Sequence, residues 1–120
     1  MKHILVVDDE PGMLRLLSRA LSSMQYRVSA ASGGPAALAA IGPEPIDLLV
    51  TDYRMPDMNG RELISAVRVR QPGLKALVVT GFPPNAQEED LDWWHAQPHL
   101  TKPFSVRSLQ DAVVGLIGLP

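Results

Sequence analysis

Short apolar runs alternate with helix-patterned segments along the whole chain, and this alternation constrains the fold more than any other feature. We predict strands at residues 3–7, 26–30, 46–51, 74–80 and 99–101. Strands separated by helices at this spacing pair in parallel through right-handed crossovers, with helices on both faces of the sheet. The predicted fold class is therefore α/β, a doubly wound five-stranded parallel sheet with the strand order 2-1-3-4-5.

The helices are recognised by apolar residues that recur at spacings of three and four. The first, which begins at Pro11, presents Leu14, Leu17, Leu21 and Met24, the second and third lie at residues 36–40 and 61–70, and the last presents Val106, Leu109, Val113 and Leu116. Residues 82–97 match no template well, because two prolines and an acidic run interrupt them. We predict a short or irregular fourth helix in that segment.

The composition limits the classes of function. At 120 residues, the chain is expected to form one domain, residues 1–120, with a buried core. The net charge is −2 and the charges are interspersed, so no positive stripe is available for phosphates and direct nucleic-acid binding is not expected. There is no cysteine, and no apolar run approaches the length of a membrane span. A soluble, cytoplasmic domain is the expectation.

Three carboxylates follow two strands that the predicted order places side by side. Asp8 and Asp9 come directly after the first strand, and Asp52 comes directly after the third. We expect the three to converge, because the carboxyl ends of parallel strands share one edge, where ligands bind. Unit charges about 4 Å apart repel by roughly 4 kcal/mol at an effective dielectric near 20, so such a cluster needs a cation or a raised pKa. Oxygen ligands of this kind suit Mg²⁺, which is the predicted cofactor.

Two further strand ends supply groups that phosphoryl transfer needs. Thr80 ends the fourth strand with a hydroxyl, and Lys102 follows the fifth strand with an ammonium group that can pair with a phosphate. The set predicts Asp52 as an aspartyl nucleophile. An aspartate after a strand is more often a turn residue or helix cap, and Asp8 or Asp9 could serve only as a cap. The joint occurrence at one sheet edge favours the chemical interpretation.

Together these motifs resemble the receiver domain of two-component response regulators, which has a flavodoxin-like fold. The resemblance covers nearly the whole chain and includes Asp8-Asp9, Asp52 with Met55-Pro56 and Gly60 after it, Thr80, and Lys102-Pro103-Phe104. It implies that Asp52 is the phosphorylation site. It also implies that Asp8, Asp9, Asp52 and the backbone carbonyl of Arg54 hold Mg²⁺.

The same resemblance implies how the phosphoryl group is detected. Thr80 and Lys102 would contact it, and the Lys102-Pro103 peptide would be cis, which the residues alone leave open. Receivers switch when the hydroxyl is drawn inward and an aromatic side chain on the fifth strand follows it. His99 occupies that position, where Tyr or Phe is usual, and would couple the switch to pH if its pKa lies near neutrality. The alternative is a partly exposed histidine with no gating role.

Other residues near the predicted site depart from the family or flank its reactive groups. The family usually has a regular fourth helix where residues 82–97 stand. Trp93 and Trp94 in this segment could form an exposed partner surface or fill the core, and we expect at least one in the core. Arg54 and Phe82, each two residues after a site residue, are expected to control the access of water.

The function implied is that of a phosphorylation-dependent receiver in a phosphorelay. It would accept a phosphoryl group on Asp52 from the phosphohistidine of a sensor histidine kinase or a histidine phosphotransfer protein, and change the surface around Thr80, His99 and Phe104. Phosphoryl transfer and dephosphorylation would be self-catalysed, so no enzyme acting on a substrate pool is predicted. A homodimer, where one forms, would use the last helix and fifth strand.

Three other functions compete with this one. A phosphate-independent, receiver-like interaction module is the alternative, although such modules often lack the complete acid, hydroxyl and lysine set. An aspartyl phosphatase needs a second acid two residues after the nucleophile, where Arg54 stands. A flavin carrier needs a Ser/Thr/Gly loop after the first strand, where this chain has Asp-Asp-Glu-Pro. The sequence leaves the cognate kinase, the phosphate lifetime, the oligomeric state and any output domain open.

Overall fold

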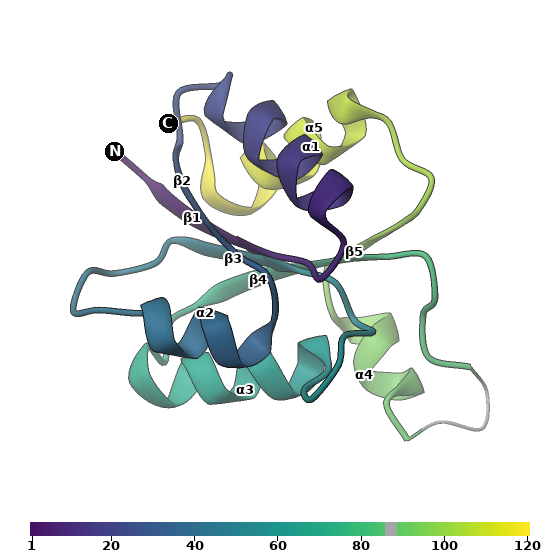
Figure 1. Ribbon diagram of the computed structural model, residues 1–120. Coiled ribbons are helices and arrows are strands. Elements are labelled where there is room, and N and C mark those ends of the chain that lie inside the picture. Colours follow the sequence, from purple (N-terminus) through teal and green to yellow (C-terminus); the bar gives the residue numbers. More distant parts are fainter. Residues whose placement is uncertain (86–88) are drawn as a thin grey trace.

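A five-stranded parallel sheet runs through the centre of the molecule (Figure 1). The computed structural model describes residues 1–85 and 89–120. Its strands are β1 (His3–Val7), β2 (Arg27–Ala31), β3 (Leu48–Thr51), β4 (Lys75–Thr80) and β5 (His99–Thr101). They pair in the order β2-β1-β3-β4-β5, which confirms the predicted class and strand order.

Helices cover both faces of the sheet, α1 and α5 on one side and α2, α3 and α4 on the other (Figure 1). They are α1 (Pro11–Ser22), α2 (Gly34–Ala40), α3 (Gly60–Arg70), α4 (Leu91–Ala96) and α5 (Val106–Ile117). Successive side chains of a strand point to opposite faces, so β1 contributes to two apolar cores. Ile4 and Val6 pack toward α1 and α5, whereas Leu5 and Val7 pack toward α2 and α3.

Capping side chains fix the start of the two helices that follow the predicted site loops. At α3, the Asn59 side chain accepts the Glu62 N–H and the Glu62 carboxylate accepts the Asn59 N–H, both at 2.9 Å. Ser105 and Ser108 make the same reciprocal pair at the start of α5. Each of these two loops therefore ends at a capped helix, which restricts its conformations.

Strands β2, β3 and β4 begin one, two and one residues later than we predicted. At β3 and β4 the reason is Gln71, which follows α3. Its side-chain oxygen accepts the Ile46 N–H at 2.7 Å, and its main-chain carbonyl accepts the Leu74 N–H at 3.1 Å. These two amide groups are satisfied by a turn residue and therefore do not join the strand ladder.

The end of α1 also differs from the expected pattern. The predicted apolar stripe included Met24, but α1 ends at Ser22, and Met24 packs against the core from the following turn. Gln25 reverses the chain there with a φ of 80°. Tyr26 then turns its ring into the core, and its hydroxyl donates to the Gly118 carbonyl. Strand β2 begins at the next residue, Arg27.

The fourth helix is short, as predicted, with six residues. Trp94 is buried in the core that also contains residues of α2 and α3, and Trp93 packs against that core, which confirms the expectation that at least one tryptophan is in the core. Residues 86–88 of this segment lie outside the described residues. Among the described residues, no helix has the length and apolar character needed to cross a membrane.

Candidate functional site

The register of the sheet brings the predicted site residues to one edge. Val7 of β1 lies opposite Thr51 of β3, so the next residues, Asp8 and Asp52, leave the two strands at the same level. In β4 and β5, Thr80 lies opposite Thr101, and Lys102 follows directly. The convergence expected from strand order is therefore present in the structure.

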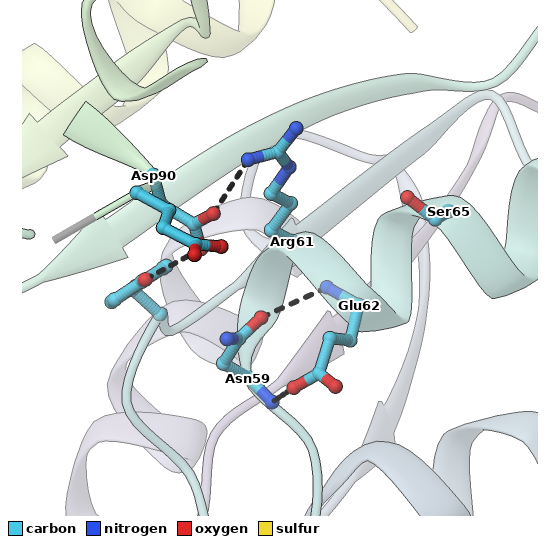
Figure 2. Close-up of a pocket in the computed structure, with 7 residues that line it drawn as sticks. Asn59, Arg61, Glu62, Ser65 and Asp90 are labelled. Atoms are coloured by element: carbon cyan, nitrogen blue, oxygen red, sulfur yellow. Dashed lines mark hydrogen bonds and ion pairs between the residues drawn. The ribbon is translucent and has the colours of Figure 1, made fainter. Parts of the chain in front are cut away.

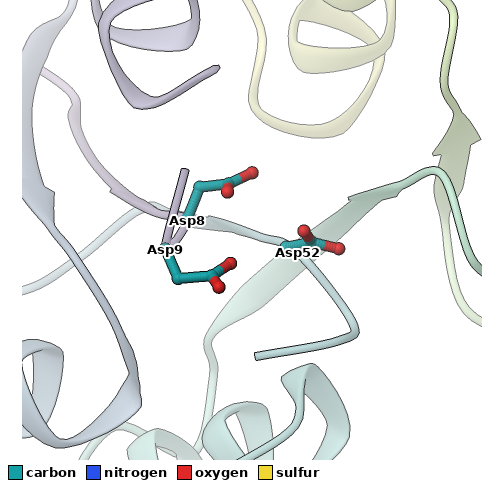
Figure 3. A group of neighbouring side chains, drawn as sticks. All are labelled: Asp8, Asp9 and Asp52. Atoms are coloured by element: carbon teal, nitrogen blue, oxygen red, sulfur yellow. The ribbon is translucent and has the colours of Figure 1, made fainter. Parts of the chain in front are cut away.

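Asp8, Asp9 and Asp52 form what we term the acidic cluster. One carboxylate oxygen from each lies within 4.8 Å of the others, and the three side chains project into a shared space (Figure 3). Asp8 and Asp52 are buried, whereas Asp9 is exposed. Three acceptor carboxylates this close could hold a metal ion, and their mutual repulsion favours one.

Lys102 is the cation that contacts this cluster. Its Nζ lies 3.2 Å from Asp8 Oδ2 and 3.4 Å from Asp52 Oδ2. Burial lowers the pKa of Lys102, but the negative charges of Asp52 and Asp8 outweigh burial and leave that pKa above its ordinary value. Burial also raises the pKa of Asp8, more than the Glu10 N–H and Lys102 lower it. One ammonium group thus compensates the cluster only in part.

Asp8 also makes a local turn contact before α1, although it is not the side-chain cap of that helix. Its Oδ1 accepts the N–H of Glu10 at 2.9 Å, just before α1 begins. Its Oδ2 faces Lys102 at the same time. The turn contact and the contact with Lys102 therefore use two different oxygens of one carboxylate, and neither caps α1.

Main-chain groups hold Asp52 in place. Its Oδ1 accepts the Tyr53 N–H at 2.7 Å and the Arg54 N–H at 3.4 Å. Gly60 packs against the same backbone: its N–H donates to the Tyr53 carbonyl, and a Cβ at this position would lie 2.5 Å from the Asp52 carbonyl oxygen. A glycine is therefore required at position 60, which explains its place in the motif.

The two predicted switch residues have defined partners. The Thr80 side chain is fully buried, and its Oγ1 accepts the Phe82 N–H at 3.2 Å. The His99 ring is half-buried and stacks on Trp94 with ring centroids 3.8 Å apart. Its Nδ1 donates to the Gln97 carbonyl at 2.8 Å. His99 is thus packed against α4, and a gating role for it stays a prediction.

Three predictions concern groups that flank the site: Arg54, Phe82 and the Lys102-Pro103 peptide. The Arg54 guanidinium lies over the Tyr53 ring and donates to the main-chain carbonyls of Phe82 and Pro83. Phe82 is 74% exposed beside it. The Lys102-Pro103 peptide is cis, as the resemblance implied. Control of water access by Arg54 and Phe82, and metal binding by the Arg54 carbonyl, stay predictions.

A second charged group near Asp52 was missed in the sequence. Its members are Tyr53, Arg61 and Asp90, which we term the Asp90 network. Asp90, just before α4, accepts the Tyr53 hydroxyl at 2.7 Å and an Arg61 N–H at 2.5 Å. Figure 2 shows Arg61 reaching from α3 to Asp90 across an open hollow. No sequence spacing signals this contact, because Tyr53 and Asp90 are 37 residues apart.

Comparison with known proteins decides the family. The family model of the response regulator receiver domain matches residues 4–114. The chain belongs to this family. Receiver domains of this kind act in two-component signalling. The response regulator receiver protein CpdR of Brucella abortus is 36% identical to this receiver over 113 residues, which cover 94% of each chain.

Two further relatives differ in how much of them this receiver covers. Transcriptional regulatory protein GlrR of Escherichia coli is 34% identical over 113 residues, which are 92% of this chain but 25% of GlrR. The receiver thus spans about a quarter of that relative's length. The structure of response regulator protein TrrA from Thermotoga maritima, in complex with Mg(2+)-BeF, has a TM-score of 0.81 and 32% identity, and covers 97% of this chain and 99% of that one.

Proposed function

We propose that this receiver accepts a phosphoryl group on Asp52 and switches a signalling surface in response. The observation that carries the proposal is the placement of Asp52 between two further carboxylates and the Lys102 ammonium, at the edge of the sheet where ligands bind. The donor is the phosphohistidine of a sensor histidine kinase or of a histidine phosphotransfer protein, in a two-component phosphorelay.

The transfer is a displacement at phosphorus. The Tyr53 N–H holds Oδ1 of Asp52, which leaves Oδ2, beside Lys102, to attack. A P–O bond to Asp52 forms as the P–N bond to the donor imidazole breaks, and the electron pair of that bond stays on the imidazole nitrogen. Water later attacks phosphorus, the P–O bond to Asp52 breaks with its electron pair on the carboxylate oxygen, and inorganic phosphate leaves. Both steps use the receiver's own site and are in this sense self-catalysed.

The acidic cluster fits a divalent cation, and Mg²⁺ is the ion that we propose. Three clustered carboxylates, two of them buried and served by the one Lys102 ammonium group, are the donor set that supports this assignment. Asp8, Asp9, Asp52 and the Arg54 carbonyl would hold the ion. When bound, Mg²⁺ neutralises negative charge on the phosphoryl oxygens and on the cluster.

The neighbouring side chains would detect the product. Lys102 pairs with the phosphoryl group, and the Thr80 hydroxyl, now an acceptor for the Phe82 N–H, donates to a phosphoryl oxygen. The phosphoryl group carries a charge of roughly −1.5 to −2 in place of the carboxylate charge of Asp52, and this change beside Lys102 is sufficient to bias a two-state arrangement of these loops. Arg54 and Phe82 limit the access of water to the acyl phosphate and so set its lifetime.

The direct test is intact mass after incubation with acetyl phosphate, with and without Mg²⁺. We expect one added phosphoryl group that requires Mg²⁺, and none in the Asp52→Asn variant. Asp57→Asn is the matched control, because Asp57 is exposed in the same loop and its φ of 70° suits asparagine equally well. Absence of the added mass in the folded wild-type protein with Mg²⁺ would instead favour a phosphate-independent interaction module.

A further inference from the structure

The Asp90 network joins α4 to the loop that carries Asp52. Asp90 immediately precedes α4, and its carbonyl accepts the Trp94 N–H in the first turn of that helix. Its carboxylate is bound by Tyr53 and Arg61, and its side chain is 17% exposed. Burial raises the pKa of Asp90, but the hydrogen bonds from Tyr53 and Arg61 and the charge of Arg61 outweigh burial and lower that pKa below its ordinary value. The charged carboxylate is therefore well matched to its partners.

Aromatic contacts add to the attachment of α4. The Trp93 ring lies 6.0 Å from the Tyr53 ring, and the Arg61 guanidinium lies 5.6 Å from the Trp93 ring centroid. On the other side of the helix, Trp94 stacks on His99 of β5. The short α4 thus depends on the Asp90 network at its start and on the Trp94–His99 pair along its length.

Tyr53 connects this attachment to the phosphorylation site. Its main-chain N–H donates to Asp52 Oδ1, while its hydroxyl donates to Asp90. A second connection runs through Arg54, whose guanidinium binds the Phe82 and Pro83 carbonyls in the segment between β4 and α4. A phosphoryl group on Asp52 removes the carboxylate charge that the main-chain N–H groups of Tyr53 and Arg54 face, and it adds new acceptor oxygens beside them. The backbone at residues 52–54 must adjust to both changes.

We propose that the Asp90 network holds α4 against the Asp52 loop in the unphosphorylated receiver, and that phosphorylation of Asp52 weakens the network and releases α4 together with the Trp94–His99 pair. The proposal rests on the phosphorylation of Asp52 proposed above. His99 then moves as part of the α4 attachment and does not rotate alone. By linkage, a change that weakens the network must also favour the α4 position of the phosphorylated state.

The chain contains its own reporter for this test, because both of its tryptophans lie in α4. It also contains a matched pair of tyrosines. Tyr53→Phe removes one hydroxyl from the Asp90 network, and Tyr26→Phe removes one hydroxyl that binds Gly118, on the α1 and α5 side of the sheet. Tryptophan emission and acrylamide quenching are measured for the wild type and both variants, with and without Mg²⁺ and beryllofluoride as the phosphoryl mimic.

We expect beryllofluoride with Mg²⁺ to shift wild-type tryptophan emission to the red and to raise its quenching constant. Tyr53→Phe should show part of this shift without the mimic, and Tyr26→Phe should match the wild type. Arg61→Gln is the second variant, with Arg68→Gln as its control, because Arg68 binds the Leu74 carbonyl and not Asp90. Arg61→Gln should shift tryptophan emission in the same direction as Tyr53→Phe does.

Identical emission and quenching in Tyr53→Phe, Arg61→Gln and the wild type would overturn the proposal. So would an unchanged wild-type signal in protein that intact mass shows to be phosphorylated. Mass spectrometry separates this failure from failure of the proposed function. A receiver that takes no phosphate contradicts the phosphorylation step, whereas the comparison of Tyr53→Phe with Tyr26→Phe still tests whether the network holds α4.

Discussion

Asp8 lies beside Asp52 and Asp90 binds the neighbouring Tyr53, and the surroundings of these two carboxylates shift their pKa values in opposite directions. Asp8 is buried, and that burial raises its pKa more than the Glu10 N–H and Lys102, which also contacts Asp52, lower it. Asp90 receives a tyrosine hydroxyl and its own arginine, and its pKa is lowered. The acidic cluster is thus left short of positive charge, as a cation site requires, while the Asp90 network is complete without a ligand.

The largest effect is expected from removing the cation of the acidic cluster. Lys102→Met leaves two buried carboxylates without their shared partner, so we expect unfolding free energy to fall by about 2 to 4 kcal/mol without Mg²⁺. Phosphorylation by acetyl phosphate should fall as well. Urea unfolding measures the first effect, with Lys75→Met as the control because Lys75 binds an exposed helix carbonyl. If Lys102→Met lost no more unfolding free energy than Lys75→Met, the acidic cluster would not need Lys102 for its stability.

Adding Mg²⁺ sharpens this prediction. If the cluster lacks positive charge, a divalent cation should restore part of the stability that Lys102→Met loses. Mg²⁺ should stabilise variants of the Asp90 network only as much as it stabilises the wild type, because that network has no charge deficit of its own. If the gain from Mg²⁺ exceeded that of the wild type by the same amount in Lys102→Met and in the Asp90-network variants, the distinction between the two regions would be lost.

A smaller effect is expected from Asp90. Asp90→Asn should lower unfolding free energy by about 1 to 2 kcal/mol at neutral pH, because it weakens a charge-assisted contact with a partly exposed arginine. A carboxyl with a lowered folded pKa stabilises the fold fully above its unfolded pKa, here 3.8, and this contribution is lost as pH falls through the folded value. The wild type and Asp90→Asn should therefore converge in stability below pH 3.8.

Asp92→Asn is the control for this pH series. Asp92 is exposed in the first turn of α4, two residues from Asp90. Its substitution should change stability little, and no convergence with pH is expected. If Asp90→Asn and Asp92→Asn follow the same pH curve, the Asp90 network does not contribute as described.

The two regions also differ in how far the sequence predicts them. Asp8, Asp52, Thr80 and Lys102 each follow or end a strand, so strand order alone places them at one edge. The family resemblance adds the cis peptide at Lys102-Pro103, which residue types leave open. The acidic cluster is therefore predictable because the sheet is regular.

The Asp90 network has no such regular element behind it. It joins a loop, the first turn of α3 and the residue before α4, and residues 82–97 carry no clear periodicity. The capping box of Asn59 and Glu62 fixes the start of α3, but not the direction of Arg61. The packing of Trp94 on His99 likewise depends on tertiary structure, so its partner could not be predicted from spacing.

The most direct test of the difference between the acidic cluster and the Asp90 network is the midpoint of thermal unfolding. It is measured for the wild type, Asp8→Asn and Asp90→Asn, each with and without Mg²⁺. Without Mg²⁺, Asp8→Asn should raise the midpoint, because a neutral amide relieves the repulsion in the acidic cluster, and Asp90→Asn should lower it. Saturating Mg²⁺ at about 100 times Kd should add roughly 2.7 kcal/mol to the wild type and to Asp90→Asn. It should add much less to Asp8→Asn. A lower midpoint for Asp8→Asn without Mg²⁺, or an undiminished response to Mg²⁺, would contradict the assignment of the acidic cluster as the cation site.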